Sequence, residues 1–381
     1  MNSRTPTISR RDFVAAGLAT AGSLAGRPLW GCGLPSDRPT VRQSVGLVIR
    51  NERPLDAEAP LDALEPPVTR LEHFFVRSHF GPPAEIPDRW TLTVDGDVAT
   101  PVTLGLDEIR RLPSVSRPVT LECAGNGRGL FELPNTSGIQ WERGAVSTAV
   151  WTGVPLATVL ERAGVSHTAQ HFWMEALDRA PLPAVPKFLR SIPRDLALSD
   201  ALVAFQINGR PIPILYGGPL RLILPGWFGM ASTKWLTHVH ARPTVSDNHF
   251  MARGYRYGDG SPVESMQVKS LITAPLAEAR VPVGRVRVRG KAWSGAKSGG
   301  IRGVGVSADG GVTWMPARLT GREEAHAWRS WEYELVVAAA GPHAVLARAT
   351  DRSGAVQPMA APPNPAGYGN NSVHAVRFYV V

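Results

Sequence analysis

The stretch TLECAGNGRGLF, residues 120–131, contains one of only two cysteines in the 381-residue chain. An apolar, strand-like run ends at Cys123, and a glycine-rich turn follows from Ala124 to Gly129. Small residues let the backbone approach a bulky ligand, and their amide groups can bind an anion. Arg128 would stabilise a thiolate or an anionic substrate. The stretch therefore predicts a strand that leads into a ligand-binding turn.

The N-terminus has the pattern of an export signal. Arg10 and Arg11 precede a weakly apolar run in the stretch SRRDFV, which resembles a twin-arginine signal. The run is too short and too weakly apolar to span a bilayer. We therefore expect residues 1–32 to be a twin-arginine signal and the protein to be periplasmic. Cys32, in LWGCG, resembles a lipoprotein processing site, so a lipid anchor and plain cleavage nearby both stay open.

Either outcome leaves Cys123 as the only cysteine in the body of an exported protein. An oxidising compartment favours paired cysteines. An unpaired cysteine is explained by burial as a small apolar residue, by a reactive thiol, or by a bond to a metal. The neighbouring glycine-rich turn and Arg128 favour a metal or a redox cofactor.

Several segments, in the right order, resemble the sulfite oxidase family of molybdenum enzymes. The resemblance runs from about residue 72 to the C-terminus and implies an α+β fold. It implies a molybdopterin-binding domain over residues 73–250 and an immunoglobulin-like β-sandwich dimerisation domain over residues 265–381. Residues 33–72 are expected to form an extended lead that packs on the body. The matching segments are 73–79, 121–129, 141–160, 172–180 with 190–198, 219–239 and 292–319.

The resemblance also implies a set of site residues. The sulfur of Cys123 would bind molybdenum, and Tyr255, Arg77, Arg128 and Trp141 would act with it at the catalytic centre. Tyr257 is a competitor for the role of Tyr255, and a core role for Trp141 is equally open. The implied cofactor-binding residues are Phe75, Arg77, His79, Cys123, Asp178, Ser191, Tyr216, Arg221, Ser232, Thr233 and Lys234.

The chemistry of several of these residues agrees with the resemblance. Arg221 and Lys234 are suitable cations for the phosphate of a pterin, and Ser232 and Thr233 are suitable hydroxyl donors. Tyr216 stands where the family has a histidine, so its role is open.

The resemblance implies oxidation of sulfite to sulfate by oxygen transfer at molybdenum. The sequence has no Cys-x-x-Cys-His haem motif, so electrons would pass to a separate carrier, expected to be a c-type cytochrome. Ala366 stands where the family has an arginine that helps to bind sulfate. Another oxo substrate, such as nitrate or an S-oxide, therefore stays open, as does a non-enzymatic exported binding protein.

Composition and local patterns set the remaining bounds. With 43% hydrophobic residues the chain is globular, and a net charge of +9 without clustered basic runs argues against nucleic-acid binding. Residues 90–98 alternate like a strand, whereas 106–112 and 155–165 have the pattern of short helices. From residue 265 onward, short alternating strands are separated by turns, with a hairpin signal at SADGG, residues 307–311.

Overall fold

The computed structural model describes residues 46–131 and 136–381. The signal expected over residues 1–32, the lipid site at Cys32 and the first part of the lead lie outside the described residues. Within the described ranges, no helix is long and apolar enough to cross a membrane.

The lead segment contains a β-hairpin, which the sequence analysis did not predict. Strand β1 (Val48–Glu52) pairs antiparallel with β2 (Leu55–Glu58). The expected extended lead therefore folds back on itself in this stretch. Ala57 of β2 exchanges two backbone hydrogen bonds with Val76, at 3.0 and 2.8 Å. Through these bonds β2 packs on the body of the protein.

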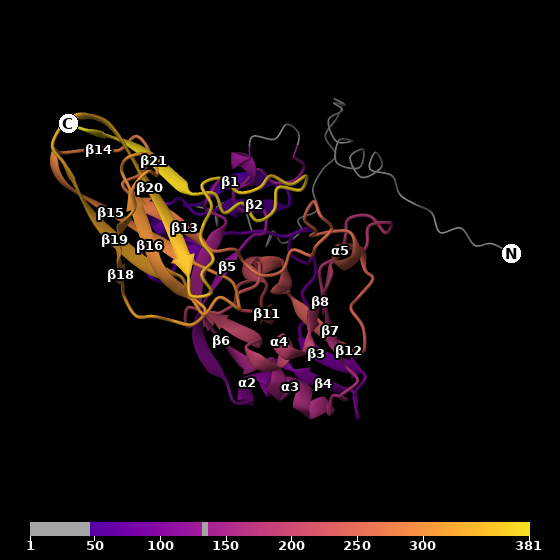
Figure 1. Cartoon of the computed structure of the whole chain (residues 1–381). Coiled ribbons are helices and arrows are strands. Elements are labelled where there is room, and N and C mark those ends of the chain that lie inside the picture. Colours follow the sequence, from indigo (N-terminus) through magenta and orange to yellow (C-terminus); the bar gives the residue numbers. More distant parts are fainter. Residues whose placement is uncertain (1–45, 132–135) are drawn as a thin grey trace, which may run out of the picture. The chain divides into compact units, whose positions relative to one another are not determined.

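Two sheets form the central part of the chain (Figure 1). One contains β5 (Val115–Glu122), β6 (Val146–Pro155), β9 (Leu202–Ile207), β10 (Arg210–Pro211) and β11 (Arg221–Ile223). Its order is β10-β9-β6-β5, and β11 also pairs with β9. The other contains β3 (Thr91–Gly96), β4 (Val102–Gly105), β7 (His171–Ala176), β8 (Leu189–Pro193) and β12 (Leu236–Arg242), in the order β4-β3-β12-β7-β8.

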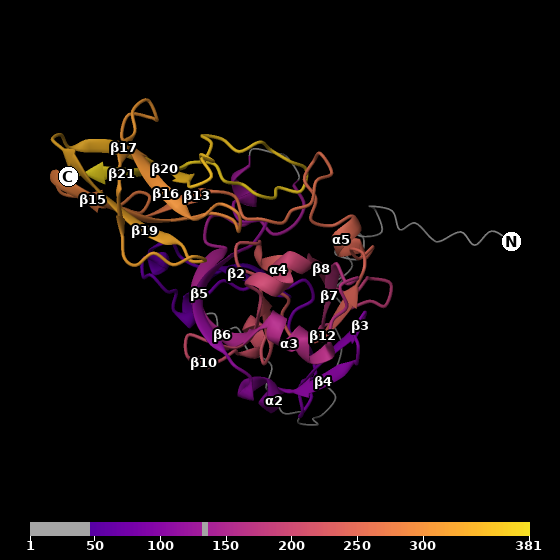
Figure 2. The ribbon, with the colours of Figure 1, turned by 60° about the horizontal axis from the view of Figure 1, so that its bottom comes forward.

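Short helices pack on these sheets (Figure 2). They are the α-helices α2 (Leu106–Arg111), α3 (Leu156–Ala163), α4 (Arg194–Ser199) and α5 (His249–Ala252). The 3-10 turns are η2 (Asp62–Leu64), η3 (Leu71–His73), η4 (Arg128–Leu130), η5 (Ile214–Tyr216) and η6 (Gly229–Ala231). The strand expected within 90–98 and the helices expected within 106–112 and 155–165 are confirmed as β3, α2 and α3.

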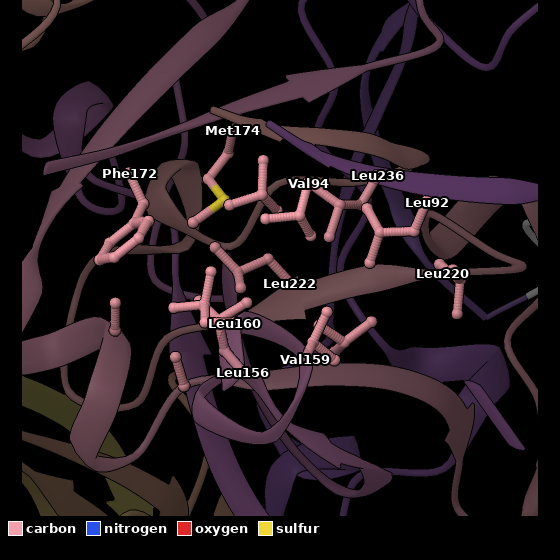
Figure 3. Close-up of a cluster of buried hydrophobic side chains, with 14 of the residues drawn as sticks. Leu92, Val94, Leu156, Val159, Leu160, Phe172, Met174, Leu220, Leu222 and Leu236 are labelled. Atoms are coloured by element: carbon pink, nitrogen blue, oxygen red, sulfur yellow. The ribbon is translucent and has the colours of Figure 1, made fainter. Parts of the chain in front are cut away.

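The largest apolar core lies between the two sheets (Figure 3). Helix α3 contributes Leu156, Val159, Leu160 and Ala163, which recur at helical spacing on one buried face. Both sheets contribute alternating strand residues that are almost fully buried, among them Leu92, Val94, Phe172, Met174 and Leu222. This core fixes both sheets as a rigid support for the loops at their ends.

The C-terminal part is a β-sandwich, as predicted. One sheet has β13 (Lys269–Ala274), β15 (Gly284–Trp293), β18 (Arg318–Thr320) and β19 (Arg329–Val337), in the order β13-β15-β19-β18. The other has β14 (Arg280–Val281), β16 (Ile301–Ser307), β17 (Met315–Pro316), β20 (Gly341–Asp351) and β21 (His374–Val380), in the order β14-β21-β20-β16-β17. The predicted hairpin at 307–311 joins β16 to β17.

A smaller apolar cluster joins the sandwich to the central sheets. It contains Ala124, which follows β5, and Val146 of β6, together with Leu271 and Trp293 from β13 and β15. The turn that begins at Cys123 therefore lies against the sandwich.

Candidate active site

One pocket gathers most of the predicted site residues. Its empty volume is about 710 Å³, including the part that is open to solvent. Ten of the fourteen predicted residues line it, namely Phe75, Arg77, His79, Cys123, Asp178, Arg221, Ser232, Thr233, Lys234 and Tyr255.

Cys123 stands where β5 ends and the chain turns. Its backbone N–H donates to the carbonyl of Ala145 at 2.9 Å, and its carbonyl accepts from the N–H of Asn126 at 2.9 Å. Gly127 then has a φ of +90°, a left-handed conformation that a residue with a side chain rarely adopts. The turn thereby directs the Cys123 side chain to the pocket wall.

Cys123 is a free, half-buried thiol. Burial raises its pKa, and the positive charges of Arg77 and Arg128 oppose that rise. The thiol therefore keeps its proton until a metal displaces it. Among the residues that the structure describes, no group of three His, Cys, Asp or Glu side chains could hold a metal. A metal at Cys123 would need further ligands, which an organic cofactor can supply.

Arg77 is held at the pocket wall by a buried carboxylate. The Nη1 of Arg77 donates to Asp56 Oδ1 and Oδ2 at 3.2 and 3.3 Å, and the backbone N–H of Ser78 donates to Oδ1 at 3.3 Å. Asp56 lies on β2 and is fully buried. Burial raises the pKa of Asp56, while the charge of Arg77 opposes this effect. Asp56 was not among the predicted site residues, because it lies in the lead, 21 residues before its partner Arg77.

His79 and Tyr255 form a hydrogen-bonded pair, with Nε2 and the phenol oxygen 2.7 Å apart. Burial lowers the pKa of His79 well below its usual range, and the charges of Arg77 and Arg190 lower it further, so the ring is neutral. Arg77 Nη2 lies 3.4 Å from His79 Nδ1 and can only donate. We therefore assign the ring proton to Nε2, which donates to Tyr255 and leaves the tyrosine's own hydroxyl hydrogen free.

The pocket distinguishes Tyr255 from Tyr257. Tyr255 lines the pocket, whereas Tyr257 does not. Tyr255 has a left-handed backbone with a φ of +52°, which costs about 1–3 kcal/mol for a residue with a side chain. Strain of this kind is typical of functional positions.

Two buried cations in the pocket, Arg221 and Lys234, have no carboxylate within ion-pairing distance among the described residues. Arg221 donates to the carbonyls of Tyr216 and Ser232, and Lys234 Nζ donates to Ser78 Oγ and the Leu215 carbonyl, both at 3.1 Å. Burial lowers the pKa of Arg221 to about 9 and that of Lys234 well below its usual range. Because an isolated buried charge is costly, an anionic ligand beside these two groups would favour their protonated forms, and the arrangement suits such a ligand.

A buried hydroxyl and a carboxyl complete this part of the pocket. The Oγ1 of Thr233 is buried and has no hydrogen-bond partner within residues 46–131 and 136–381, so it is ready to donate to a ligand. Burial raises the pKa of Asp178 to about 6. Together with the two cations, these groups fit the phosphate and polar ring atoms of a pterin cofactor.

Four predicted residues lie outside the pocket lining, namely Arg128, Trp141, Ser191 and Tyr216. Arg128 donates through Nε to the Ala366 carbonyl at 2.9 Å and through Nη1 to the Ile139 carbonyl at 3.0 Å. Two of its guanidinium nitrogens are thus held by backbone carbonyls, and Arg128 does not line the pocket.

The side chains of the other three residues contact the rest of the protein and do not face the pocket. Trp141 is fully buried in an apolar cluster, which supports the core role left open for it. Tyr216 donates its hydroxyl to the Leu71 carbonyl at 2.7 Å. The Oγ of Ser191 lies 3.4 Å from His171 Nδ1, on the opposite side of β8 from its buried neighbour Arg190.

Two residues near the pocket were missed by the sequence analysis. The guanidinium of Arg190 lies 5.1 Å from the Tyr255 ring centre, and its buried Nε has no partner in the part of the chain that the structure describes. The Tyr368 ring stacks on Tyr255 with centroids 5.4 Å apart, and the Arg128 guanidinium lies 5.2 Å from the Tyr368 ring centre. No local sequence pattern marks Arg190 or Tyr368, because each contacts the site through a residue that is distant in sequence.

Residues 79–250 match the family described as the oxidoreductase molybdopterin binding domain, and residues 261–380 match the Mo-co oxidoreductase dimerisation domain. The chain is 34% identical over 361 residues to mitochondrial sulfite oxidase of Homo sapiens, covering 88% of this chain and 66% of that protein. It is 36% identical over 343 residues to sulfite oxidase of Gallus gallus, covering 84% and 74%. The chain thus spans just under two thirds of the human protein's length.

Further similarities extend beyond sulfite oxidases. The NADH nitrate reductase of Spinacia oleracea is 31% identical over 354 residues, covering 81% of this chain and 38% of that protein. Among solved structures, the sulfane dehydrogenase SoxCD of Paracoccus pantotrophus superposes with a TM-score of 0.77 at 26% identity. That superposition covers 91% of this chain and 92% of the other.

Proposed function

Because this chain belongs to the sulfite oxidase family of molybdopterin-binding oxidoreductases, we propose that it oxidises sulfite to sulfate with a molybdenum–molybdopterin cofactor. The electrons would pass to an external carrier. Membership of this enzyme family sets aside the alternative of a non-enzymatic binding protein.

The observation that carries the proposal is the content of one pocket. The Cys123 thiol lines the same cavity as Arg77, Tyr255 and the two buried cations Arg221 and Lys234. A soft thiolate suits molybdenum, and the two cations suit a phosphate. Such a pocket can hold an anionic cofactor and admit a small anionic substrate.

When bound, the cofactor supplies two-electron oxygen-transfer chemistry at its metal. Cys123 provides a ligand to that metal after loss of the thiol proton. Arg77, fixed by Asp56, presents a charged guanidinium to an oxyanion. Tyr255 accepts from the neutral His79 and donates its own hydroxyl hydrogen toward the pocket, where it would hold a substrate oxygen.

Export and partners are also part of the proposal. The paired Arg10 and Arg11 support twin-arginine export to the periplasm, with a lipid anchor at Cys32 as a variant of that route. The match of residues 261–380 to a dimerisation domain supports a homodimer. A c-type cytochrome would suit the role of electron carrier, and no haem would be bound by this chain.

One observation favours a second class of substrate. Ala366 stands where an arginine was expected, so this part of the site has one cation fewer than a sulfite site was expected to have. An S-oxide is uncharged and nitrate carries a single negative charge, so either would need less positive charge in the site than the sulfite dianion.

Steady-state assays on the purified protein test the proposal. We expect molybdenum close to one per chain and sulfite-dependent reduction of ferricyanide. Molybdenum content with no sulfite oxidation, but with turnover of nitrate or an S-oxide from a reduced dye, would favour the second class. Absence of molybdenum from protein made in cells that synthesise the cofactor would contradict the proposal as a whole.

A further inference from the structure

The residue directly before Cys123 is bound by the sandwich. Glu122 Oε1 accepts from Lys269 Nζ at 2.8 Å, and Oε2 accepts from Trp293 Nε1 at 2.8 Å. Lys269 lies on β13 and Trp293 on β15. Asn126, in the cysteine turn itself, donates its Nδ2 to Glu122 Oε1 at 2.9 Å. One carboxylate therefore ties the cysteine turn to two strands of the C-terminal sheet.

This ion pair is deeply buried. The side chains of Lys269 and Glu122 are only 4% and 3% exposed. Burial lowers the pKa of Lys269, and the charge of Glu122 opposes that effect. Lys269 Nζ also lies 3.4 Å from the Asn126 carbonyl. In such surroundings, removal of one partner is far more damaging than replacement of both by neutral groups.

The far side of the cysteine turn is also held by the C-terminal part of the chain. The N–H of Gly369 donates to the Ala124 carbonyl at 2.8 Å, and Asn370 Nδ2 donates to the Gly127 carbonyl at 2.8 Å. The turn is thus fixed from both sides by residues that follow the molybdopterin-binding domain.

We propose that Glu122 and Lys269 are positioning residues for Cys123, so that the sandwich is a working component of the metal site. The inference rests on the proposed role of Cys123 as a molybdenum ligand. Both oxygens of Glu122 are bound by donors from different elements, which fixes the direction of the carboxylate. Because Cys123 is the next residue, the position of its sulfur follows from that direction.

A purely stabilising role would not require charges. Apolar residues of similar volume often replace a buried ion pair without loss of stability. What the loss of both charges removes is the charge-assisted hydrogen bond from Lys269 Nζ, which holds the Glu122 side chain in one direction. Stability and sulfur position should therefore respond differently when both charges are removed together.

The experiment compares Lys269→Met, the double variant Glu122→Gln/Lys269→Met and wild-type holoenzyme. Measured quantities are molybdenum content, the sulfur-to-metal charge-transfer absorption per bound molybdenum, kcat and KM for sulfite, and the urea midpoint of unfolding. Trp293→Phe, which deletes one donor to Glu122 and keeps an aromatic ring, serves if Lys269→Met does not fold.

The control is Lys291→Met. Lys291 is a buried lysine of β15 that donates to Ser330 Oγ at 2.7 Å, within the sandwich. Its loss should lower the urea midpoint and leave the absorption and kcat at wild-type values.

We expect Lys269→Met to lower the urea midpoint, shift the charge-transfer band and reduce kcat by about tenfold to a hundredfold, as small misplacements at reacting centres do. The double variant should regain most of the midpoint and keep the altered band and low kcat. A double variant with wild-type absorption and kcat would overturn the proposal, as would unchanged absorption in Lys269→Met. These outcomes presuppose a wild type that binds molybdenum and turns over sulfite. A wild-type protein that binds no molybdenum or does not turn over sulfite would contradict the proposed function, and not this role of the ion pair.

Discussion

At the scale of single residues, the pocket combines two kinds of buried positive charge. Within the described ranges, Arg221 and Lys234 have no carboxylate at ion-pairing distance, whereas Arg77 is fixed by Asp56. Arg221 and Lys234 suit the anionic group of a bound cofactor, whereas Arg77 suits a substrate anion that binds and leaves in each turnover.

Asp56→Ala should raise KM for sulfite. The change frees the Arg77 guanidinium, and loss of one charge-assisted contact of about 1.5–3 kcal/mol corresponds to roughly a tenfold to hundredfold weaker interaction. Asp56→Asn retains an acceptor for Arg77 and should lose less. Molybdenum content should stay normal. The control is Asp95→Asn, which breaks a more exposed pair with His240 on the second sheet. A normal KM in Asp56→Ala would contradict the role of Asp56.

Asp178 makes the stability of the cofactor-free protein depend on pH. Burial raises its folded-state pKa from 3.8 to about 6, so the folded protein binds the proton more tightly than the unfolded chain does. Stability from this group is present below about pH 4 and is lost as pH rises to about 6, by roughly 2–3 kcal/mol at most. Asp178→Asn should remove this decline in urea titrations between about pH 4 and 7. A decline of equal size in the variant would show that another group causes it.

At the scale of elements, the turn after β5 depends on tight backbone packing. Gly127 has a positive φ, and a Cβ at this position would lie 3.0 Å from the Cβ of Asn370. The turn therefore needs glycine both for its conformation and for its contact with the C-terminal segment.

Gly127→Ala should destabilise the protein by about 1–3 kcal/mol and lower its molybdenum content, because the turn must shift. Gly209→Ala is a matched control. Gly209 also has a positive φ, but a Cβ added there would meet no atom of the described chain within 4 Å. This variant should lose stability through backbone strain alone and keep its molybdenum. Equal molybdenum content in the two variants would count against a role of the packed turn in metal binding.

Local patterns predicted many elements correctly, and long-range contacts explain the misses. Helix α3 and strand β3 could be predicted from the spacing of apolar residues within each segment alone. The direction of the Arg128 side chain depends on Ala366, 238 residues away, and the ion pair of Arg77 depends on a strand of the lead. The residue types at the motif positions predicted most of the side chains that line the pocket. The orientation of side chains at the edge of the pocket is decided by contacts with residues that lie far away in the sequence.

At the scale of the whole molecule, the molybdopterin-binding part and the sandwich share contacts at the cysteine turn. Glu122 and Lys269 form a buried pair across this contact, and the backbone N–H of Trp328 donates to Thr120 Oγ1 of β5 at 2.7 Å. Folding of both parts is therefore expected to precede stable metal binding.

Replacement of Arg10 and Arg11 together by Lys should leave a folded, cofactor-loaded protein in the cytoplasm. The reason is that the twin-arginine pattern ahead of a weak apolar run would no longer be recognised. Cell fractionation with molybdenum analysis of each fraction measures the effect. Normal accumulation of the double variant in the periplasm would contradict the proposed route.

The assignment of Cys123 as the metal ligand is tested by the absorption spectrum and activity of Cys123→Ser, measured per bound molybdenum. Serine is a harder ligand than cysteine and cannot give sulfur-to-metal charge transfer from this position. We expect a folded variant that retains most of its pterin through Arg221 and Lys234, lacks that absorption, and loses activity by orders of magnitude. A Cys123→Ser protein with a wild-type band and near-normal turnover of sulfite would contradict the assignment of Cys123 as the metal ligand.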